Sequence, residues 1–227
     1  MYRFLLACLL SFTAFCAQAI TLDQISNQDA VAGLREALQK GAGNAVGKLG
    51  KTDGFFGNPQ VKIPLPASLQ KVDGLLRSFG MGKYADELVL TMNRAAEAAV
   101  PEAKTLLINA IKGMSVQDAK GILTGGNTAA TEFFRRTTSQ PLRAKFLPIV
   151  KQATSKVRLA DKYDQFAGQA GKMGLIDEKD ANLENYITQK ALDGLFLMMA
   201  EEEKAIRADP VGQTSKLLSK VFGAIGR

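Results

Sequence analysis

Apolar residues recur every three or four positions through nearly all of the chain after residue 20, and strict alternation of apolar and polar residues is almost absent. Spacing of this kind places the apolar side chains on one face of an α-helix, whereas alternation is typical of a half-buried β-strand. The sequence therefore predicts an all-α fold, in the form of an irregular helical bundle. Because no internal repeat or low-complexity linker interrupts the pattern, residues 20–227 are expected to form a single domain.

The centre of this bundle is predicted to be the last long helix, at about 182–208. It ends before Asp209-Pro210, and its middle, 192–200, is apolar on nearly every side apart from Asp193 and Gly194. A helix that is apolar all round has no face to turn to water, so it belongs in the middle of a bundle. We therefore expect this C-terminal helix to be buried.

Start and stop signals divide the rest of the chain. They predict helices at about 28–49, 68–80, 83–100, 101–113, 115–123 and 128–139, a kinked helix across Pro141 and Pro148, and a short helix at 215–222. The first carries several interior glycines, each of which costs about 0.5–1 kcal/mol relative to alanine. It should therefore have tertiary support or break near Gly41. The prolines of 59–66 forbid helix there and favour an extended backbone.

The first nineteen residues have the pattern of a cleavable signal peptide. A basic start at 1–3 precedes an apolar run at 4–15, and Ala17-Gln18-Ala19 follows. The run is too short to span a bilayer, which needs about 20 residues, and the small-x-small ending suits signal peptidase. We expect cleavage after Ala19, a periplasmic protein and no transmembrane helix in the mature chain. Cys8 is too close to the N-terminus, and Cys16 follows a bulky phenylalanine, which argues against lipidation.

The amino-acid composition closes several kinds of chemistry. The chain has no histidine and no tryptophan, and both of its cysteines lie in the predicted signal peptide. Ser-His-Asp and Cys-His catalysis and conventional zinc sites are therefore excluded from the mature chain. No calcium-loop motif occurs, and we expect neither a metal nor a cofactor. Carboxylates remain, so a glycan hydrolase that works with paired carboxylates stays open as an alternative.

The strongest local signal is a basic stretch at 133–160 that contains no acidic residue. Its seven cations are Arg135, Arg136, Arg143, Lys145, Lys151, Lys156 and Arg158. Such a surface could bind anionic lipid or another anionic partner in the envelope. Alternatively, the chain itself could neutralise it, because 177–209 holds nine acidic residues against four basic ones. A nucleic-acid partner is not expected, because the signal peptide directs the chain to export.

Glu202 is the carboxylate that stands out, since at helical spacing it shares an apolar stripe with Ile187 and Ile206. A buried carboxylate needs a partner, and catalytic acids also arise from burial. Glu202 is therefore a weak candidate for a catalytic acid, and the favoured interpretation is a structural ion pair with an arginine such as Arg94. Asn93 also lies on an apolar stripe, so Asn93, Arg94 and Glu202 are predicted to form a buried polar network.

Three further features have mainly structural interpretations. Glu203 and Arg207, four residues apart, are expected to form a surface pair. Gly125-Gly126-Asn127 is expected to be a turn and helix cap, with anion binding through free amides as the alternative. Phe55 and Phe56 are expected to cover the core, because an exposed aromatic pair is costly outside an interface.

Five strings taken in order resemble a known family. They are Lys62-Ile63-Pro64-Leu65-Pro66, Asn93-Arg94-Ala95-Ala96-Glu97, Thr128-Ala129-Ala130-Thr131-Glu132-Phe133-Phe134-Arg135, Lys190-Ala191-Leu192-Asp193-Gly194-Leu195-Phe196 and Glu202-Glu203-Lys204-Ala205-Ile206-Arg207. This set resembles the exported bacterial family catalogued as domain of unknown function 4197, over about 30–223. The resemblance implies an exported helical protein of Gram-negative bacteria, and it supplies no activity, ligand or catalytic residue.

These observations favour a non-enzymatic protein that binds an apolar or anionic envelope ligand, or a protein partner. One alternative is a cell-wall glycan hydrolase with Glu202 as general acid, which requires a second carboxylate within about 5–10 Å. Another is a structural scaffold of the envelope, which would show an exposed apolar patch. The sequence identifies neither the ligand nor the oligomeric state.

The signal-peptide assignment predicts that the exported protein begins at Ile20 and carries no acyl group. Signal peptidase accepts the small-x-small ending at Ala19, whereas neither cysteine has the surroundings that lipidation needs. Intact-mass measurement of the protein purified from its own host tests this. A species that begins at Cys8 or Cys16 with the added mass of lipid would contradict it.

Overall fold

The computed structural model describes residues 27–80, 82–155 and 182–209. In these residues the chain is helical and contains no strand, so the predicted all-α bundle is confirmed. The helices are α1 (Asn27–Leu49), α2 (Ala67–Ser78), α3 (Gly82–Ala99), the 3-10 helix η2 (Val100–Glu102), α4 (Ala103–Lys112), α5 (Val116–Thr124), α6 (Ala129–Thr154) and α8 (Leu183–Ala208). The predicted signal peptide and the predicted helix at 215–222 lie outside the described residues.

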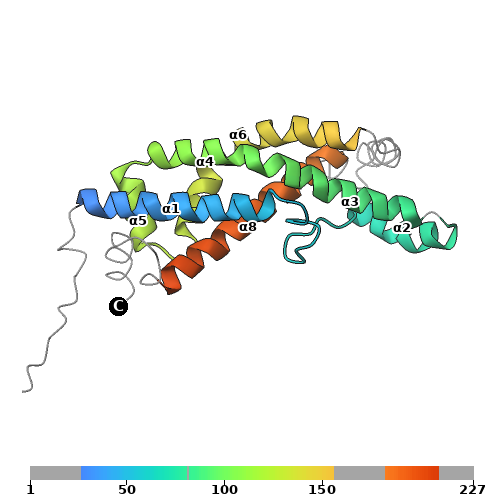
Figure 1. The fold of residues 1–227 in the computed structure, drawn as a ribbon, viewed down its shortest axis with the longest axis horizontal. Coiled ribbons are helices and arrows are strands. Elements are labelled where there is room, and N and C mark those ends of the chain that lie inside the picture. Colours follow the sequence, from blue (N-terminus) through green and yellow to red (C-terminus); the bar gives the residue numbers. More distant parts are fainter. Residues whose placement is uncertain (1–26, 81, 156–181, 210–227) are drawn as a thin grey trace, which may run out of the picture.

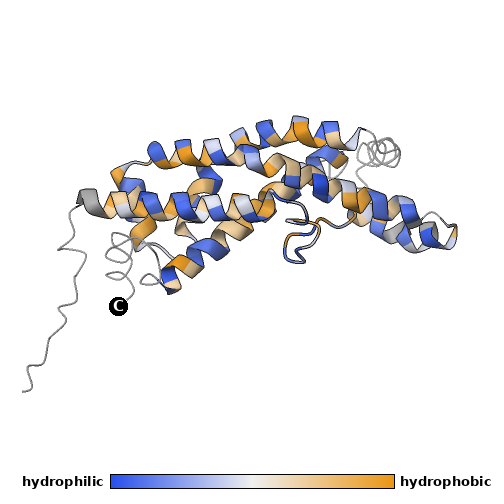
Figure 2. Ribbon diagram, in the orientation of Figure 1, coloured by the Kyte–Doolittle hydropathy of each residue, from blue (hydrophilic) through white to orange (hydrophobic). Residues whose placement is uncertain are grey.

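The helices form an elongated bundle in which α3, η2 and α4 follow one another along the length of the molecule (Figure 1). Helix α2 lies beside α3 at one end and packs mainly against it. Hydrophobic and hydrophilic residues alternate in bands along the helices, as packing of amphipathic helices requires (Figure 2). Helix α8 packs against α1, α3 and α6, and five of the six positions in 191–196 are buried. The prediction of a buried C-terminal helix is therefore confirmed.

Most predicted helix ends are confirmed, because they depend on local chemistry. Gly80, with φ of 72°, follows α2 in the left-handed conformation that glycine adopts without strain. Ser115 and Asp118 form the predicted capping box at the start of α5. Hydrogen bonds from the Ser115 hydroxyl and backbone N–H lower the pKa of Asp118. The side chain of Asn182 caps α8 by accepting a hydrogen bond from the backbone N–H of Asn185.

The sequence predicted that helix α1 either has tertiary support or breaks near Gly41. The helix is continuous from Asn27 to Leu49, so it does not break. Gly41 is buried against α8, where an added Cβ would lie 3.5 Å from Ile206 and 3.7 Å from Glu202. Leu34 and Ala45 of the same helix are fully buried. Packing of α1 against α4 and α8 offsets the conformational cost of its glycines.

Helix α6 is one helix of 26 residues, whereas the sequence suggested a boundary near Ser139. Pro141 and Pro148 lie inside it and are exposed. Seven of its nine buried residues occur at every fourth position: Ala130, Phe134, Thr138, Leu142, Phe146, Val150 and Thr154. Because an α-helix has 3.6 residues per turn, such a stripe shifts by about 40° at each step and winds around the helix. Helix α6 can therefore pack against α3, α4, α5 and α8 along its length.

The segment between α1 and α2 is held to α3 by Asn93, which is fully buried. Its Oδ1 accepts a hydrogen bond from the Ile63 backbone N–H at 2.8 Å, and its Nδ2 donates to the Ile63 carbonyl at 2.9 Å. Nδ2 also donates to the Val89 carbonyl at 2.7 Å. The Asn93 amide thus satisfies both the N–H and the carbonyl group of Ile63. A neighbouring β-strand would make the same pair of hydrogen bonds.

The same segment carries Phe55, which is fully buried against Gly194 of α8. Glu97 of α3 accepts hydrogen bonds from the backbone N–H groups of Phe55 and Phe56, both at 3.0 Å. The predicted cover of the core is confirmed for Phe55. Phe56 is half-buried, with the ammonium of Lys62 at 4.2 Å from its ring centroid.

The contact between Phe55 and α8 predicts opposite effects for two glycine-to-alanine substitutions. In Gly194→Ala the new Cβ would lie 2.7 Å from Phe55 Cε1 and 3.3 Å from Val61 Cβ, inside the packed core. We expect overpacking to destabilise the protein by about 1–3 kcal/mol. Gly43→Ala is the matched control, since its Cβ would meet nothing within 4 Å. That change should stabilise the protein by about 0.5–1 kcal/mol through helix propensity.

Urea unfolding of the two variants and the unchanged protein measures both effects. Equal stabilisation by the two substitutions would show that Phe55 does not press on Gly194.

Candidate ligand-binding cleft

A polar cleft opens between the start of α2, the middle of α6 and the first half of α8. Its volume is about 620 Å³, within the range of about 300–1,000 Å³ in which small-molecule sites fall. It is lined by Pro64, Ala67, Gln70, Arg143, Asn185, Tyr186, Gln189, Lys190 and Asp193. Amides, two cations, a phenol and one carboxylate therefore meet around one hollow.

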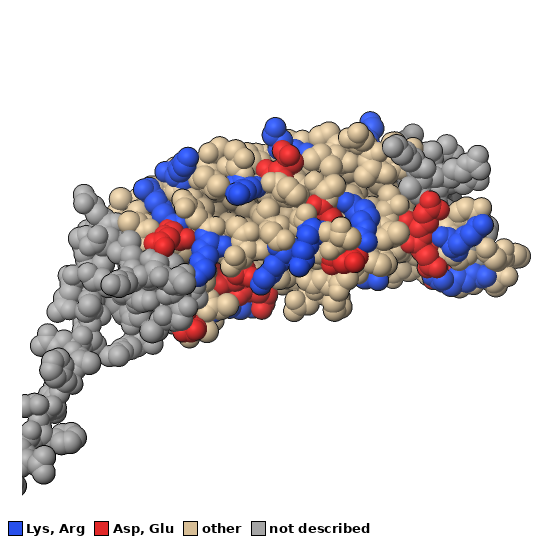
Figure 3. Space-filling view, viewed as in Figure 1, with Lys and Arg blue, Asp and Glu red and all other residues tan. Residues whose placement is uncertain are grey.

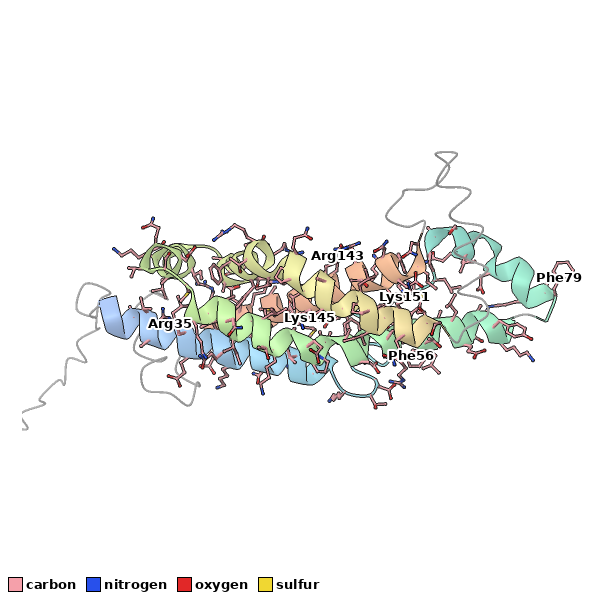
Figure 4. All side chains as sticks on the ribbon, turned by 90° about the horizontal axis from the view of Figure 1, so that it is seen from above. Arg35, Phe56, Phe79, Arg143, Lys145 and Lys151 are labelled. Carbon is pink, nitrogen blue, oxygen red and sulfur yellow. The ribbon has the colours of Figure 1, made fainter. Side chains whose placement is uncertain are left out.

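Arg143 is the best-oriented cation of this cleft. Its Nη1 donates to Oε1 of Gln189 and its Nη2 donates to Oδ1 of Asn185, both at 3.1 Å. Both acceptors are neutral amide oxygens, so they fix the plane of the guanidinium without cancelling its charge. Gln189 is itself held, because its Nε2 donates to Oδ1 of Asp193 at 2.9 Å. Figure 4 shows Arg143 on α6 beside α8.

Other polar groups of the cleft are fixed by contacts with the backbone. The Tyr186 hydroxyl donates to the Pro64 carbonyl at 3.1 Å, which ties α8 to the extended segment. Gln70 donates to the Leu65 carbonyl at 2.6 Å. The ammonium of Lys190 lies 5.7 Å from the centroid of the Tyr186 ring. The cleft therefore has one wall of extended backbone and one wall of helix side chains.

Of the residues that line this cleft, only Arg143 was a candidate from the sequence. Asn185, Gln189 and Asp193 are polar residues at four-residue spacing along a helix that is otherwise mainly apolar. That stripe is a signal that could have been found, because it requires one side of a central helix to face something polar. The sequence could not show that Arg143 faces this stripe, because Arg143 lies 42 positions before Asn185 and only the packing of α6 on α8 brings them together.

A second hollow is apolar and much smaller. It lies between α1, α6 and α8, with Leu34, Phe134 and Met199 in its lining and Glu203 at its edge. Its volume of about 30 Å³ has room for roughly one or two water molecules, not for a lipid chain. The geometry therefore favours the polar cleft over an apolar site.

The five cations of the basic stretch that the structure describes do not form one cationic face. Arg136 pairs with Asp118 of α5 at 3.0 Å, and Arg135 lies 3.8 Å from Glu132 and 4.7 Å from the centroid of the Phe196 ring. Arg143 turns toward α8, whereas Lys145 points about 160° away around α6 by helical geometry. Lys145 and Lys151 are exposed (Figure 4). Lys156 and Arg158 lie outside the described residues.

Three acidic residues of α8 pair with cations outside the basic stretch. Glu201, Glu202 and Glu203 form ion pairs with Lys204, Lys48 and Arg207, none of which belongs to α6. Acidic and basic side chains are interspersed over the face shown in Figure 3 and do not gather by sign. The described residues of the basic stretch thus make individual contacts, of which those of Arg143 border a cleft. Asp177, Glu178 and Asp180 of the acidic segment lie outside the described residues.

The predicted partner of Glu202 is wrong. Its Oε1 pairs with the Lys48 ammonium at 2.5 Å and its Oε2 accepts from Asn44 at 2.9 Å, so it joins α8 to α1. Arg94 pairs instead with Glu97 at 2.6 Å and Asp53 at 2.7 Å. Asn93 and Arg94 hold the segment before α2, and Glu202 belongs to a separate network. Glu202 therefore connects two helices through its side-chain contacts. This arrangement does not support a role for Glu202 as a general acid.

Glu203 and Arg207 form the predicted pair, but this pair does not lie on the surface, because Glu203 is buried. The Glu203 carboxylate accepts hydrogen bonds from the backbone N–H of Ala130 at 3.0 Å, and from the N–H and hydroxyl of Thr131, both at 2.9 Å. Arg207 pairs with it at 2.8 Å and donates to the Ile122 carbonyl. The N-terminus of a helix attracts an anion, and at α6 the side-chain carboxylate of Glu203 takes that place.

The strings that carry the family resemblance meet in these networks. Asn93 in one string holds Ile63 in another, and Glu203 in a third caps the helix that begins in a fourth. The fifth contains Gly194, against which Phe55 packs. Residues 24–223 match the family described as "Protein of unknown function (DUF4197)". The chain belongs to this family.

Membership in DUF4197 leaves the activity of this protein open. No curated protein and no solved structure matches the chain. Within the described residues, none of the helices combines the length and the apolar character that a membrane crossing requires.

The two neighbouring glutamates of this DUF4197 protein allow a matched test. In Glu203→Gln the new NH₂ group meets backbone donors, which leaves a buried group unsatisfied and should cost about 1–3 kcal/mol. In Glu202→Gln the lost partner is Lys48, whose side chain is 58% exposed, so we expect a cost of at most about 1 kcal/mol.

Thermal and urea unfolding of both variants give the comparison. A larger loss for Glu202→Gln would contradict the role of Glu203 as the helix cap.

Proposed function

We propose that this protein is an exported, non-enzymatic binding protein that holds a small anionic ligand in the cleft around Arg143. The observation that carries the proposal is a guanidinium fixed by two neutral oxygens at the edge of a cleft of about 620 Å³. A cation that is oriented before the ligand arrives loses little conformational freedom on binding.

The donor count of Arg143 supports an anion. A guanidinium has five N–H groups, and Asn185 and Gln189 accept hydrogen bonds from two of them. The remaining donors can bind a carboxylate or a phosphate in the two-point geometry that arginine favours. Lys190 adds a second positive charge to the lining.

The rest of the lining narrows the ligand class. Among the described residues that line the cleft, Asp193 is the one carboxylate, and it accepts a hydrogen bond from Gln189. A carboxylate near two cations suits a ligand that carries a hydroxyl or ammonium group besides its anionic group. A phosphate that belongs to a lipid headgroup has the same chemistry as a free phosphate ester.

The proposed location comes from the sequence. The basic, apolar and small-residue sections of residues 1–19 are those of a cleavable signal peptide. Export would bring the cleft into contact with periplasmic solutes and with the lipids of the envelope. The non-enzymatic role fits a cleft whose polar side chains bond mostly to one another and to the backbone.

The proposal predicts that Arg143→Gln removes binding and Lys145→Gln does not. Lys145 is an exposed cation of the same helix and therefore controls for net charge. We expect the affinity for glycerol 3-phosphate or malate to fall at least tenfold in Arg143→Gln, because a hydrogen bond to a charged group contributes about 1.5–3 kcal/mol. Calorimetric titration with each probe measures this.

Native mass spectrometry of protein purified from its own periplasm identifies a ligand that stays bound. Absence of binding by both probes and of any retained anion, or equal affinities in the two variants, would contradict the proposed function.

A further inference from the structure

The hairpin of α2 and α3 ends in an exposed aromatic side chain. Phe79, in the turn between the two helices, is 74% exposed, and Tyr84 in the first turn of α3 is 41% exposed. Figure 4 shows Phe79 at the far end of the molecule, pointing away from the bundle. Because α2 packs mainly against α3, this turn lies apart from the main core.

The turn is held in shape by contacts within the hairpin. Arg77 of α2 bonds to Asp73 at 2.9 Å and to Asp86 of α3 at 2.7 Å, and the bond from Arg77 lowers the pKa of Asp86. Gly80 adopts φ of 72°, and a Cβ at Gly82 would lie 3.0 Å from Arg77 Cγ. These contacts fix the two helices on either side of Phe79, so its exposure belongs to the folded shape of the hairpin.

The charges at the tip are arranged around the aromatic rings. Arg77 is compensated by two carboxylates, whereas Lys83 is exposed with its ammonium 5.1 Å from the centroid of the Tyr84 ring. An apolar ring at the extremity, with a phenol and a lysine just behind it, matches the order of groups from acyl chains to headgroups at a bilayer surface.

The two exposed rings by themselves are too small for a stable protein interface. A phenylalanine and a tyrosine have about 150–250 Å² each, and only part of each ring is exposed here. A stable protein interface, including one between two copies of this chain, buries about 800 Å² on each side. A bilayer needs no matching surface and can take up a convex tip.

We propose that the tip of the α2–α3 hairpin, formed by Phe79, Tyr84 and Lys83, inserts into the surface of a lipid bilayer. Phe79 enters the boundary between headgroups and acyl chains, and Tyr84 and Lys83 remain among the headgroups. One inserted ring gives a weak and reversible association, which places the protein at a membrane without anchoring it. This inference does not depend on the occupant of the Arg143 cleft.

The absence of tryptophan from the chain allows a direct test. Phe79→Trp introduces the sole indole at the tip, and Val116→Trp is the matched control, because Val116 is 55% exposed on α5 at the other end of the molecule. Both variants are purified in their natively processed form and mixed with vesicles of phosphatidylcholine containing one-fifth phosphatidylglycerol.

We expect the emission of Phe79→Trp to shift to the blue and to be quenched by lipids brominated in the acyl chain, while Val116→Trp changes in neither respect. Phe79→Ser should lower the vesicle partition coefficient of the otherwise unchanged chain about tenfold. The association should persist at 1 M salt, because insertion of an apolar ring is not screened as charge attraction is.

Three outcomes would overturn the proposal. The first is an emission from Phe79→Trp that vesicles leave unchanged. The second is an equal shift in both tryptophan variants, which would indicate adsorption without a preferred surface. The third is a blue shift of Phe79→Trp that grows with protein concentration in the absence of lipid, which would indicate self-association through the tip.

Discussion

The hydrogen bonds that Glu203 accepts from the first turn of α6 set the position of α6 relative to α8. Two backbone N–H groups, a hydroxyl and a guanidinium converge on this one buried carboxylate. A helix N-terminus buried without such an acceptor would leave its amide groups unsatisfied, at a cost of about 1–3 kcal/mol for each group. The start of α6 is therefore fixed at the C-terminal part of α8.

The cleft is a consequence of that alignment further along the same pair of helices. With the start of α6 fixed at Glu203, Arg143 comes to lie beside Asn185 and Gln189, near the other end of α8. The opposite wall depends on α3, where Asn93 holds Ile63 in an extended backbone and so places Pro64 at the cleft. Two buried polar residues on different helices thus position the two sides of one site.

The proposed ligand-binding cleft and the proposed membrane contact lie at the two ends of one hairpin and differ in the side chains that they present. The cleft lies at the base of α2, where Ala67 and Gln70 line it, and it is polar because α8 turns a stripe of amides and a carboxylate toward α6. The tip presents the exposed Phe79 ring, and its Arg77 is paired with two aspartates. A protein that touches a membrane with one end of the hairpin and holds an anion at the other could collect its ligand near the lipid surface.

The sequence by itself determined the helical class, the buried C-terminal helix and most helix ends. Those depend on residues that are close in the chain, such as Gly80 after α2 or Ser115 and Asp118 at α5. Only the tertiary structure decided which partners the charged side chains bind. Glu202 and Lys48 are 154 positions apart, and Glu203 and Ala130 are 73 apart. The alignment of packed helices brings such pairs together, and it depends on contacts over the whole core that no local pattern records.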